Sequence, residues 1–422
     1  MQYIMMALAG ISSLYFIYHA IIAIKGYTKK YEPIAPADAT KRIAVVIPAR
    51  NESRVIGNLV DSIKKQNYPQ ELFDIYVVPN NCTDDTAKVA LKSGSKILNC
   101  TVPVHSKGEV LSFAFNKLLK GDVDYDGFVI LDADNIVDGG FLQAINDALA
   151  AGYQAGQCFR DSKNPKDNWV TSCMSVFFWF MNCLFNQPRA MLGISVPFNG
   201  TGIVFGADFL RKNGYKTTSL TEDLEMTAQC ALAGEKVAWI PSAITYDEQT
   251  RNVGDSIVQR RRWAAGMRQC LKYVPEMLKR GITRGDRVCI DVSVHFSGVV
   301  VQLIGTIPMV YTLIMIVIMY IRHDPNATVY LLFVLASMLL GFFVSGMAYA
   351  LLVLLVSGKM RKSRHVPLLT MGLFLITWVP ANLMGYLLKI PTWNEIPHES
   401  VVGIDQRDIQ EKEDESEVAK TL

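Results

Sequence analysis

Phe128–Val129–Ile130–Leu131–Asp132–Ala133–Asp134–Asn135 is the stretch that best indicates how the chain folds. Its four apolar residues, two of them β-branched, predict a buried strand. The strand runs into Asp132 and Asp134, which lie on the same side of an extended chain because side chains alternate between its two faces. At a strand end, two carboxylates could hold a divalent cation together with phosphate oxygens. An Asx turn after an ordinary strand would explain the same residues, so the metal hypothesis depends on the rest of the chain.

Composition indicates a soluble domain flanked by membrane segments. The chain has 422 residues, half of them hydrophobic, and a mean hydropathy of +0.20, with the apolar excess at the two ends. A formal net charge of only +3 gives no indication of a nucleic-acid partner. Eight cysteines include no C-x-x-C pair and no zinc-type spacing. Reduced thiols in a cytosolic domain therefore explain them better than disulfides do.

Four apolar blocks predict a multi-pass protein of the cell membrane. Residues 1–24 are long enough to cross a bilayer, and they lack a basic leader and a clear small-residue cleavage site, so we expect an anchor and not a signal peptide. Lys25, Lys29 and Lys30 follow and indicate that the chain is cytosolic from there on. Three further blocks within residues 297–390 are also long enough to span: 297–321, 328–356 and 366–388.

Residues 41–250 alternate strand-like and helix-like patterns. Strands are expected at 43–48, where Pro48 would end the strand, and at 74–79, 128–131 and 203–205; helices are expected at 55–65, 86–93 and 107–119. This alternation predicts a mainly parallel sheet with helices on both faces. Ligands of such sheets bind at the carboxyl ends of the strands. Polar clusters occur at three of these ends, in residues 48–52, 80–85 and 132–134.

Three later segments each allow a structural and a functional interpretation. The aromatic segment 169–185 is either a core helix or a helix that leans on the membrane. Thr221 followed by Glu222 and Asp223 suits a helix N-cap with acids in the first turn, but Asp223 could also be a general base. Residues 198–202 form a glycine-rich turn through which backbone could approach a ligand.

Gln259–Arg260–Arg261–Arg262–Trp263 is the most unusual polar stretch. In a helix Gln259, Arg262 and Trp263 share one face, where they could bind a diphosphate and a sugar ring. Arg260 and Arg261 then point away from this face, and their side chains could bind lipid phosphates. The alternative is a basic amphipathic helix at the level of the lipid headgroups. For these reasons we expect residues 251–296 to form amphipathic helices at the membrane surface.

Taken together, these motifs resemble the membrane-integrated family 2 glycosyltransferases, the group of the cellulose, chitin and hyaluronan synthases. The resemblance runs over residues 43–270, and the matching pieces occur in the family's order. It implies a Rossmann-like α/β GT-A domain joined to α-helical transmembrane segments. It also implies a sugar nucleotide, usually a UDP-sugar, and Mg²⁺ or Mn²⁺ as cofactor.

The resemblance also implies roles for individual residues. Ala49, Glu52 and Asp84 would contact uridine, and Lys107 would lie near the nucleotide. Asp132 would lie at the diphosphate and Asp134 on the metal. Asp223, next to Glu222, would deprotonate the acceptor. The remaining residues would hold the diphosphate and the acceptor sugar: Gln259, Arg262 and Trp263. One position departs from the family, because Asn80 stands where many relatives carry an aspartate.

Three functions follow as hypotheses. The first is an inverting, processive synthase of a β-linked polysaccharide that uses a UDP-sugar, UDP-glucose as first guess, and also exports the growing glycan. Its partners would be membrane lipids and either a second copy of the chain or accessory export proteins. The second is a transferase that adds one sugar to a lipid, resembling ceramide glucosyltransferases. The third is a catalytically silent membrane scaffold, against which the presence of Asp132, Asp134 and Asp223 argues.

The expected topology contains a conflict. With a cytosolic enzyme domain, three later crossings would place Trp393 and His398 of the tail, residues 391–422, outside the cell. In the synthases that this chain resembles, a tryptophan-containing segment lies in the cytosol. We therefore expect that one apolar block does not span. Beyond Gln406 the tail is charged and acidic, which is typical of a disordered segment.

Overall fold

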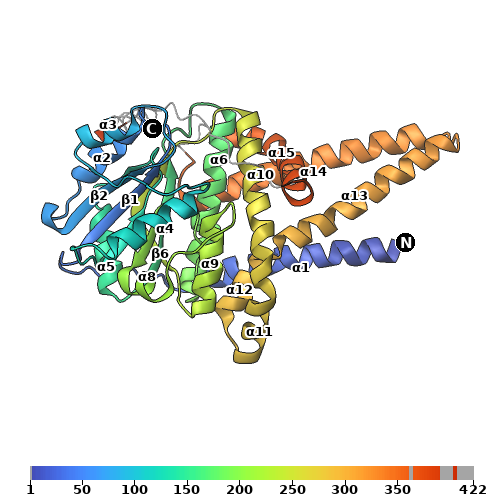
Figure 1. Ribbon diagram of the computed structural model, residues 1–422. Helices are drawn as coiled ribbons and strands as arrows, with labels where there is room; N and C mark the ends of the chain where they lie inside the picture. The colour runs from blue at the N-terminus through green and yellow to red at the C-terminus, as the bar shows by residue number, and fades with distance from the viewer. Residues whose placement is uncertain (1, 361–364, 390–402, 406–422) are drawn as a thin grey trace, which may run out of the picture.

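The computed structural model describes residues 2–360, 365–389 and 403–405, and it consists of an α/β domain from which long helices project (Figure 1). The sheet has the strand order β3-β2-β1-β4-β7-β6-β8-β5. The strand bounds are β1 Ile43–Ala49, β2 Phe73–Pro79, β3 Lys96–Ile97, β4 Gly127–Ile130, β5 Ile136–Val137, β6 Ala155–Ser162, β7 Ile203–Gly206 and β8 Ala238–Asp247. Pro48 does not end its strand as expected, because β1 continues to Ala49.

The sheet is mixed, which corrects the expectation of a mainly parallel one. Strands β3, β2, β1 and β4 are parallel, but β7 runs antiparallel to both β4 and β6, and β5 runs antiparallel to β8. Strand β6 was hard to predict because Arg160 and Asp161 interrupt its apolar run. The two-residue strands β3 and β5 are too short to show any pattern.

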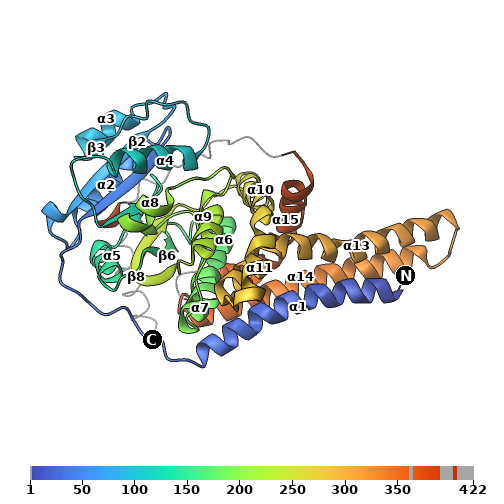
Figure 2. The same cartoon turned by 60° about the horizontal axis from the view of Figure 1, so that its bottom comes forward.

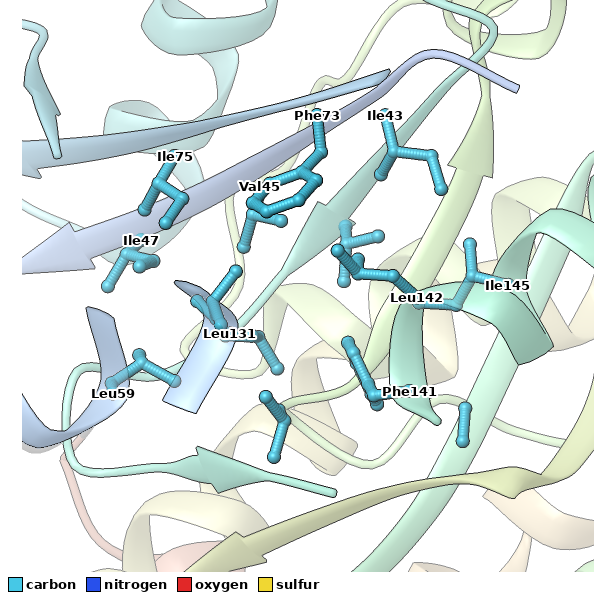
Figure 3. Close-up of a cluster of buried hydrophobic side chains, with 14 of the residues drawn as sticks. Ile43, Val45, Ile47, Leu59, Phe73, Ile75, Leu131, Phe141, Leu142 and Ile145 are labelled. Carbon is cyan, nitrogen blue, oxygen red and sulfur yellow. The ribbon is translucent and has the colours of Figure 1, made fainter. Parts of the chain in front are cut away.

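Helices cover both faces of the sheet, as expected. Alternate residues of β1 enter two different cores: Ile43, Val45 and Ile47 pack with α2 and α5 (Figure 3), while Ala44 and Val46 pack with α4 and α9. The helices of the domain are α2 Ile56–Lys64, α3 Thr86–Lys92, α4 Lys107–Leu118, α5 Phe141–Ala150, α8 Ala207–Asn213 and α9 Glu222–Ala233, and a short 3₁₀ turn covers Gln70–Leu72.

Among the residues that the structure describes, four helices are long and apolar enough to cross a membrane, namely Tyr3–Tyr27, Arg287–Ile321, Ala327–Ser357 and Val366–Leu387. Three of them, α1 Gln2–Tyr27, α13 Gly298–Ile321 and α14 Ala327–Ser357, project together from the domain (Figures 1 and 2). α12 Arg287–Phe296 leads directly into α13. Most large apolar side chains of α13 and α14 are exposed, as contact with lipid requires.

The fourth apolar helix, α15 Val366–Leu387, does not project with the others. It lies against the base of α14, α10 Val253–Cys270 and α6 Trp169–Phe180, and runs across the direction of α1 and α13 (Figures 1 and 2). Glycine permits the close crossing with α10, since a Cβ added at Gly385 would lie 2.6 Å from the Cβ of Ala264. The aromatic helix α6 therefore packs between the domain and the apolar helices, in a core that it shares with α14 and α15.

A buried ion pair fastens the membrane helices to the domain. Arg189, 1% exposed, donates from Nε to Oδ2 of Asp291 on α12 at 2.8 Å, and its Nη2 lies 2.9 Å from Nδ1 of His19 on α1. Arg189 belongs to α7 Gln187–Met191, which follows the π-helical turn Met181–Asn186. The remaining elements are the 3₁₀ turn Leu271–Tyr273 and α11 Val274–Arg284.

Some of the expectations above fall on residues outside the described part of the chain. These are Trp393, His398 and the tail beyond Gln406.

Candidate active site

A cavity of about 520 Å³ opens where the loops after β1, β2 and β4 meet α9 and α10. Its volume lies in the range of sites that bind small molecules. The predicted site residues that line it are Ala49, Glu52, Lys107, Asp132, Asp134, Glu222, Asp223, Gln259, Arg262 and Trp263. The folded chain therefore brings together carboxylates that are about ninety residues apart in sequence, Asp132 and Asp223 among them.

Asp84 is the predicted site residue that does not line the cavity. Its carboxylate accepts hydrogen bonds from the backbone nitrogens of Ser53 and Thr86, at 3.1 and 3.0 Å. Partial burial raises the pKa of Asp84, but the hydrogen bonds from Thr86 and Ser53 outweigh this effect and hold the pKa below its usual value. Asp84 thus joins the loop after β1 to the start of α3 and supports the cavity from behind.

Asn80 has a comparable supporting position. Its side-chain amide donates to the carbonyl oxygen of Ala49 at 3.0 Å, which ties the end of β2 to the end of β1. An amide can make this bond to a carbonyl and a carboxylate cannot, which is a structural reason for asparagine at this departure from the family pattern.

Lys107 connects two of the acidic residues. Its Nζ, at the first residue of α4, lies 2.6 Å from Oδ1 of Asp132 and 3.2 Å from Oε1 of Glu222. It also donates to the carbonyl oxygen of Gly200 at 2.7 Å. Burial alone would lower the pKa of Lys107, but the charges of Asp132 and Glu222 outweigh it and raise the pKa. Lys107 therefore stays an ammonium ion that links the end of β4 to the start of α9.

Asp223 lies in the first turn of α9 and is partly exposed to the cavity. Burial on its other sides, followed by the charge of Glu222, raises the pKa of Asp223 to about 7. A carboxylate with such a pKa can accept a proton near neutral pH. Thr221 is the N-cap residue of α9 and the acids occupy its first turn, as the cap interpretation predicts, but Thr221 makes no side-chain capping bond and packs instead against Gly266 of α10.

Asp134 is 6% exposed and accepts hydrogen bonds from the backbone nitrogen of Glu248, at 3.3 Å, and from the side chain of Asn135, at 3.4 Å. Within the described ranges no three His, Cys, Asp or Glu side chains converge into a metal site. Mg²⁺ and Mn²⁺ suit such a place only when a substrate supplies further oxygens, because they bind to one or two carboxylates together with phosphates. Asp132 and Asp134 have the chemistry of such an incomplete donor set.

Arg160 of β6 also lines the cavity, and sequence reasoning missed it. Its Nε and Nη2 donate to Oδ2 of Asp247 at 3.0 and 2.5 Å, and its guanidinium lies 3.8 Å from the centre of the Phe178 ring. Gly200, with φ of +86°, keeps the neighbouring space open: an added Cβ would lie 3.5 Å from Nη1 of Arg160 and 3.8 Å from Oδ2 of Asp223. Arg160 and the candidate base therefore lie on either side of Gly200, where the positive φ and not a lack of space favours glycine.

The arginine stretch of α10 has two faces, as its spacing predicts. Gln259, Arg262 and Trp263 face the cavity. Arg260 is fully buried against α15, where it donates to Oγ1 of Thr377 at 2.9 Å, so the expectation that it binds lipid phosphates is wrong. It lies 4.5 Å from the ring centre of Phe374, and aromatic rings offer a desolvated cation a favourable face.

Comparison with known proteins identifies the family. Residues 40–266 match the family model described as "Glycosyltransferase like family 2". Two curated relatives are Protein RfbJ of Shigella flexneri, 38% identical over 96 residues, and the beta-monoglucosyldiacylglycerol synthase of Synechocystis sp., 24% identical over 276 residues. The matches cover 23% and 63% of this chain. The chain spans 67% of the length of the first relative and 56% of the second.

A solved structure extends the likeness to the whole fold. The mannosyltransferase PcManGT of Pyrobaculum calidifontis, solved with GDP-Man and Mn²⁺, superposes with a TM-score of 0.59 over 90% of this chain and 98% of its own, at 16% sequence identity. At that identity the likeness concerns the fold alone. The family match covers more than half of the chain. The chain belongs to the glycosyltransferase like family 2, and its α/β domain has the GT-A fold.

Proposed function

We propose that this protein is an inverting hexosyltransferase that moves a sugar from a UDP-sugar to a hydroxyl group of a membrane lipid. The observation that carries the proposal is the meeting of Asp132, Asp134 and Asp223 in one cavity, which is also lined by α10, the helix that packs on the apolar helix α15. Family membership supports the reaction type. The intact set of acids argues against a catalytically silent scaffold.

Asp223 would act as the base that takes the proton from the acceptor hydroxyl. Its raised pKa suits proton transfer near pH 7. Glu222 is engaged by Lys107 and would orient this lysine, which leaves Asp223 as the acid that faces the substrate. A single attack on the anomeric carbon from the side opposite the diphosphate inverts the configuration, so an α-linked donor would give a β-linked product.

The departing diphosphate would be met by fixed positive charge. Arg262 and Lys107 line the cavity, and a guanidinium can bind two phosphate oxygens at once. Asp132 and Asp134 would hold Mg²⁺ or Mn²⁺, which supplies further charge neutralisation to a diphosphate when bound. Ala49 and Glu52 line the loop side of the cavity and would contact the nucleoside, with Asp84 holding that loop in place.

An aromatic cluster supports a lipid as the acceptor. Trp263 lines the cavity on one side and on the other stacks on Phe177 of α6, with ring centres 6.0 Å apart. Phe177 in turn lies 5.0 Å from Trp378 of α15. Aromatic contacts therefore lead from the cavity to the apolar helix α15, the direction from which a lipid would enter. The Synechocystis relative, whose name denotes glycolipid synthesis, agrees with this acceptor class.

A processive β-polysaccharide synthase is the second candidate, and the Gln259-x-x-Arg262-Trp263 face at the cavity favours it. Export of a glycan would need an enclosed path through the bilayer. The large apolar side chains of α13 and α14 are mostly exposed, so these helices do not enclose such a path in one chain. This candidate therefore requires a homo-oligomer or accessory export proteins.

For localisation we propose a multi-pass protein of the cell membrane with the catalytic domain in the cytosol. The lysines that follow α1 support this orientation: Lys25, Lys29 and Lys30.

Product size separates the candidates. The purified chain in lipid nanodiscs receives diacylglycerol, Mn²⁺ and one radiolabelled donor at a time, beginning with UDP-glucose and UDP-N-acetylglucosamine and including GDP-mannose. Lipid that carries one sugar supports the proposal, whereas a long glycan supports the synthase. Asp223→Asn is the matched control, and equal product from both proteins with every donor would overturn the assignment of the base.

A further inference from the structure

Helix α11 Val274–Arg284 carries an apolar ridge that no other described element covers. Its inner residues Met277 and Gly281 are buried. On the outer side Leu278 and Ile282 are 37% and 77% exposed, and Pro275 is exposed one turn earlier. These three residues are at i, i+3 and i+7, so they form one stripe along the helix. An exposed isoleucine in such a stripe is typical of a surface that meets another apolar phase.

Cations lie near this ridge: Lys279 neighbours Pro275 and Ile282 on the helix surface, while Arg284 ends α11 and Arg287 begins α12. Lys279, Arg284 and Arg287 are exposed, and within the described residues none of the three forms an ion pair. Arg280, by contrast, lies 2.8 Å from Asp286 and is already engaged. Glu276 is the acidic residue on the exposed side of the helix, so the outer face keeps an excess of positive charge.

The position of α11 relates this face to the membrane. α12 begins at Arg287 and continues through α13 as the apolar span that ends at Ile321. α11 packs on α12 (Figure 1), and both views place α11 at the base from which α1 and α13 project (Figures 1 and 2). A helix at that level, with an exposed apolar stripe and cations near it and at its end, matches amphipathic helices that lie in the headgroup region of a bilayer.

The same helix holds α9, whose first turn carries Asp223. Lys272 and Tyr273, which precede α11, donate to Oε1 of Glu225 at 2.9 and 2.7 Å. At the other end of α9, Arg280 donates to the carbonyl oxygen of Leu232. Between these contacts Met277 packs with Ala228 and Ala231 of α9. A shift of α11 would therefore move α9 as well.

We propose that the outer face of α11 binds the anionic headgroups of bilayer lipids, and that this binding holds α9 in the arrangement that transfer requires. The second half rests on the proposed function, but the first half does not. The cations bind the phosphates, and Leu278 and Ile282 enter the boundary between headgroups and acyl chains.

Lipid binding is tested without any reference to activity. Native mass spectrometry of the purified full chain counts the phosphatidylglycerol and phosphatidylcholine molecules that remain bound. The triple variant Lys279→Ala, Arg284→Ala, Arg287→Ala should lose about a hundredfold in affinity for phosphatidylglycerol, because each cation near an anionic surface contributes about fivefold. The matched control removes three exposed lysines far from the membrane helices, namely Lys92 of α3, Lys117 of α4 and Lys120 just after α4. Equal losses in the two triple variants, or no preference for the anionic lipid in the natural chain, would overturn the site.

The effect on α9 is tested by sugar transfer in nanodiscs of phosphatidylcholine, with and without phosphatidylglycerol. We expect phosphatidylglycerol to raise the rate of sugar transfer for the natural chain and for the triple lysine control. It should not raise this rate for the triple variant of Lys279, Arg284 and Arg287 or for Ile282→Asp. A variant that loses lipid binding and yet keeps the full stimulation would disprove the link to α9. If no protein transfers sugar in any lipid, the proposed function fails, while the binding measurement still decides the site.

Discussion

Asp223 and Glu222 are adjacent in sequence but have different surroundings. Glu222 lies 3.2 Å from the Lys107 ammonium, whereas Asp223 has a raised pKa and faces the cavity. Adjacent acids with different partners are a common arrangement in enzymes, in which one acid holds a neighbouring group in place and the other takes part in proton transfer. This separation is the reason to assign the base to Asp223 and a positioning role to Glu222.

Asp223→Asn should lower the transfer rate by roughly 10²- to 10⁴-fold, the usual contribution of a general base. Binding of the donor should survive, because the amide keeps the shape of the side chain. For the natural chain, kcat/KM should rise with pH and level off above about pH 7, since only the deprotonated carboxylate accepts a proton. Transfer rates across pH 5 to 9 and calorimetric donor binding measure both effects. A flat pH profile would exclude Asp223 as the base.

Local sequence motifs could predict most of the residues that line the cavity, because acids and arginines at strand ends and on one helix face form recognisable patterns. Arg160 and Asp247 could not be predicted in this way. Neither belongs to a recognisable motif, and only the pairing of β6 with β8 brings them together. Asp84 was expected in contact with the nucleotide, but hydrogen bonds to Ser53 and Thr86 place it behind the loop.

At the level of elements, α10 connects the cavity to the apolar helices. One face carries Gln259, Arg262 and Trp263, another buries Arg260 on α15, and Gly266 lets Thr221 of the loop before α9 approach closely. Helical periodicity predicted the first face. It could not predict the second, because hydropathy marks α15 as a spanning segment and says nothing about the direction in which that helix runs.

Gly385→Ala tests the crossing of α10 and α15. The added Cβ would lie 2.6 Å both from the Cβ of Ala264 and from the carbonyl oxygen of Arg261, so the helices must separate. We expect a loss of about 1–3 kcal/mol in stability, as for other overpacked sites, together with slower transfer because α10 carries part of the cavity. Gly341→Ala in α14 is the matched control, since its Cβ would meet no atom within 4 Å. Thermal unfolding in detergent compares the two, and identical midpoints would show that the crossing tolerates separation.

At the scale of the whole molecule, the contacts of α15 indicate on which side of the membrane the chain continues after this helix. Arg268 donates to the carbonyl oxygens of Tyr386 and Leu388, so α15 ends beside α10. Further along the chain, Asp405 pairs with Lys65 at the end of α2 at 2.5 Å. Both contacts lie on the side of the α/β domain, and they support the expectation that one apolar block does not cross.

We therefore expect the chain after α15 to lie on the same side of the membrane as the catalytic domain, with α1, α13 and α14 as the crossing helices. An epitope added after Leu422 should be cut by protease only in those vesicles in which the catalytic domain is also cut. A second epitope in the turn between α13 and α14, after Asp324, should show the opposite accessibility, because that turn lies at the far ends of the projecting helices (Figure 1). Since α15 is long and apolar enough to span, hydropathy alone predicts that the two epitopes share a side. Protection of both epitopes in vesicles whose catalytic domain is cut would show that α15 crosses the bilayer, and its packing on α10 would then need another explanation.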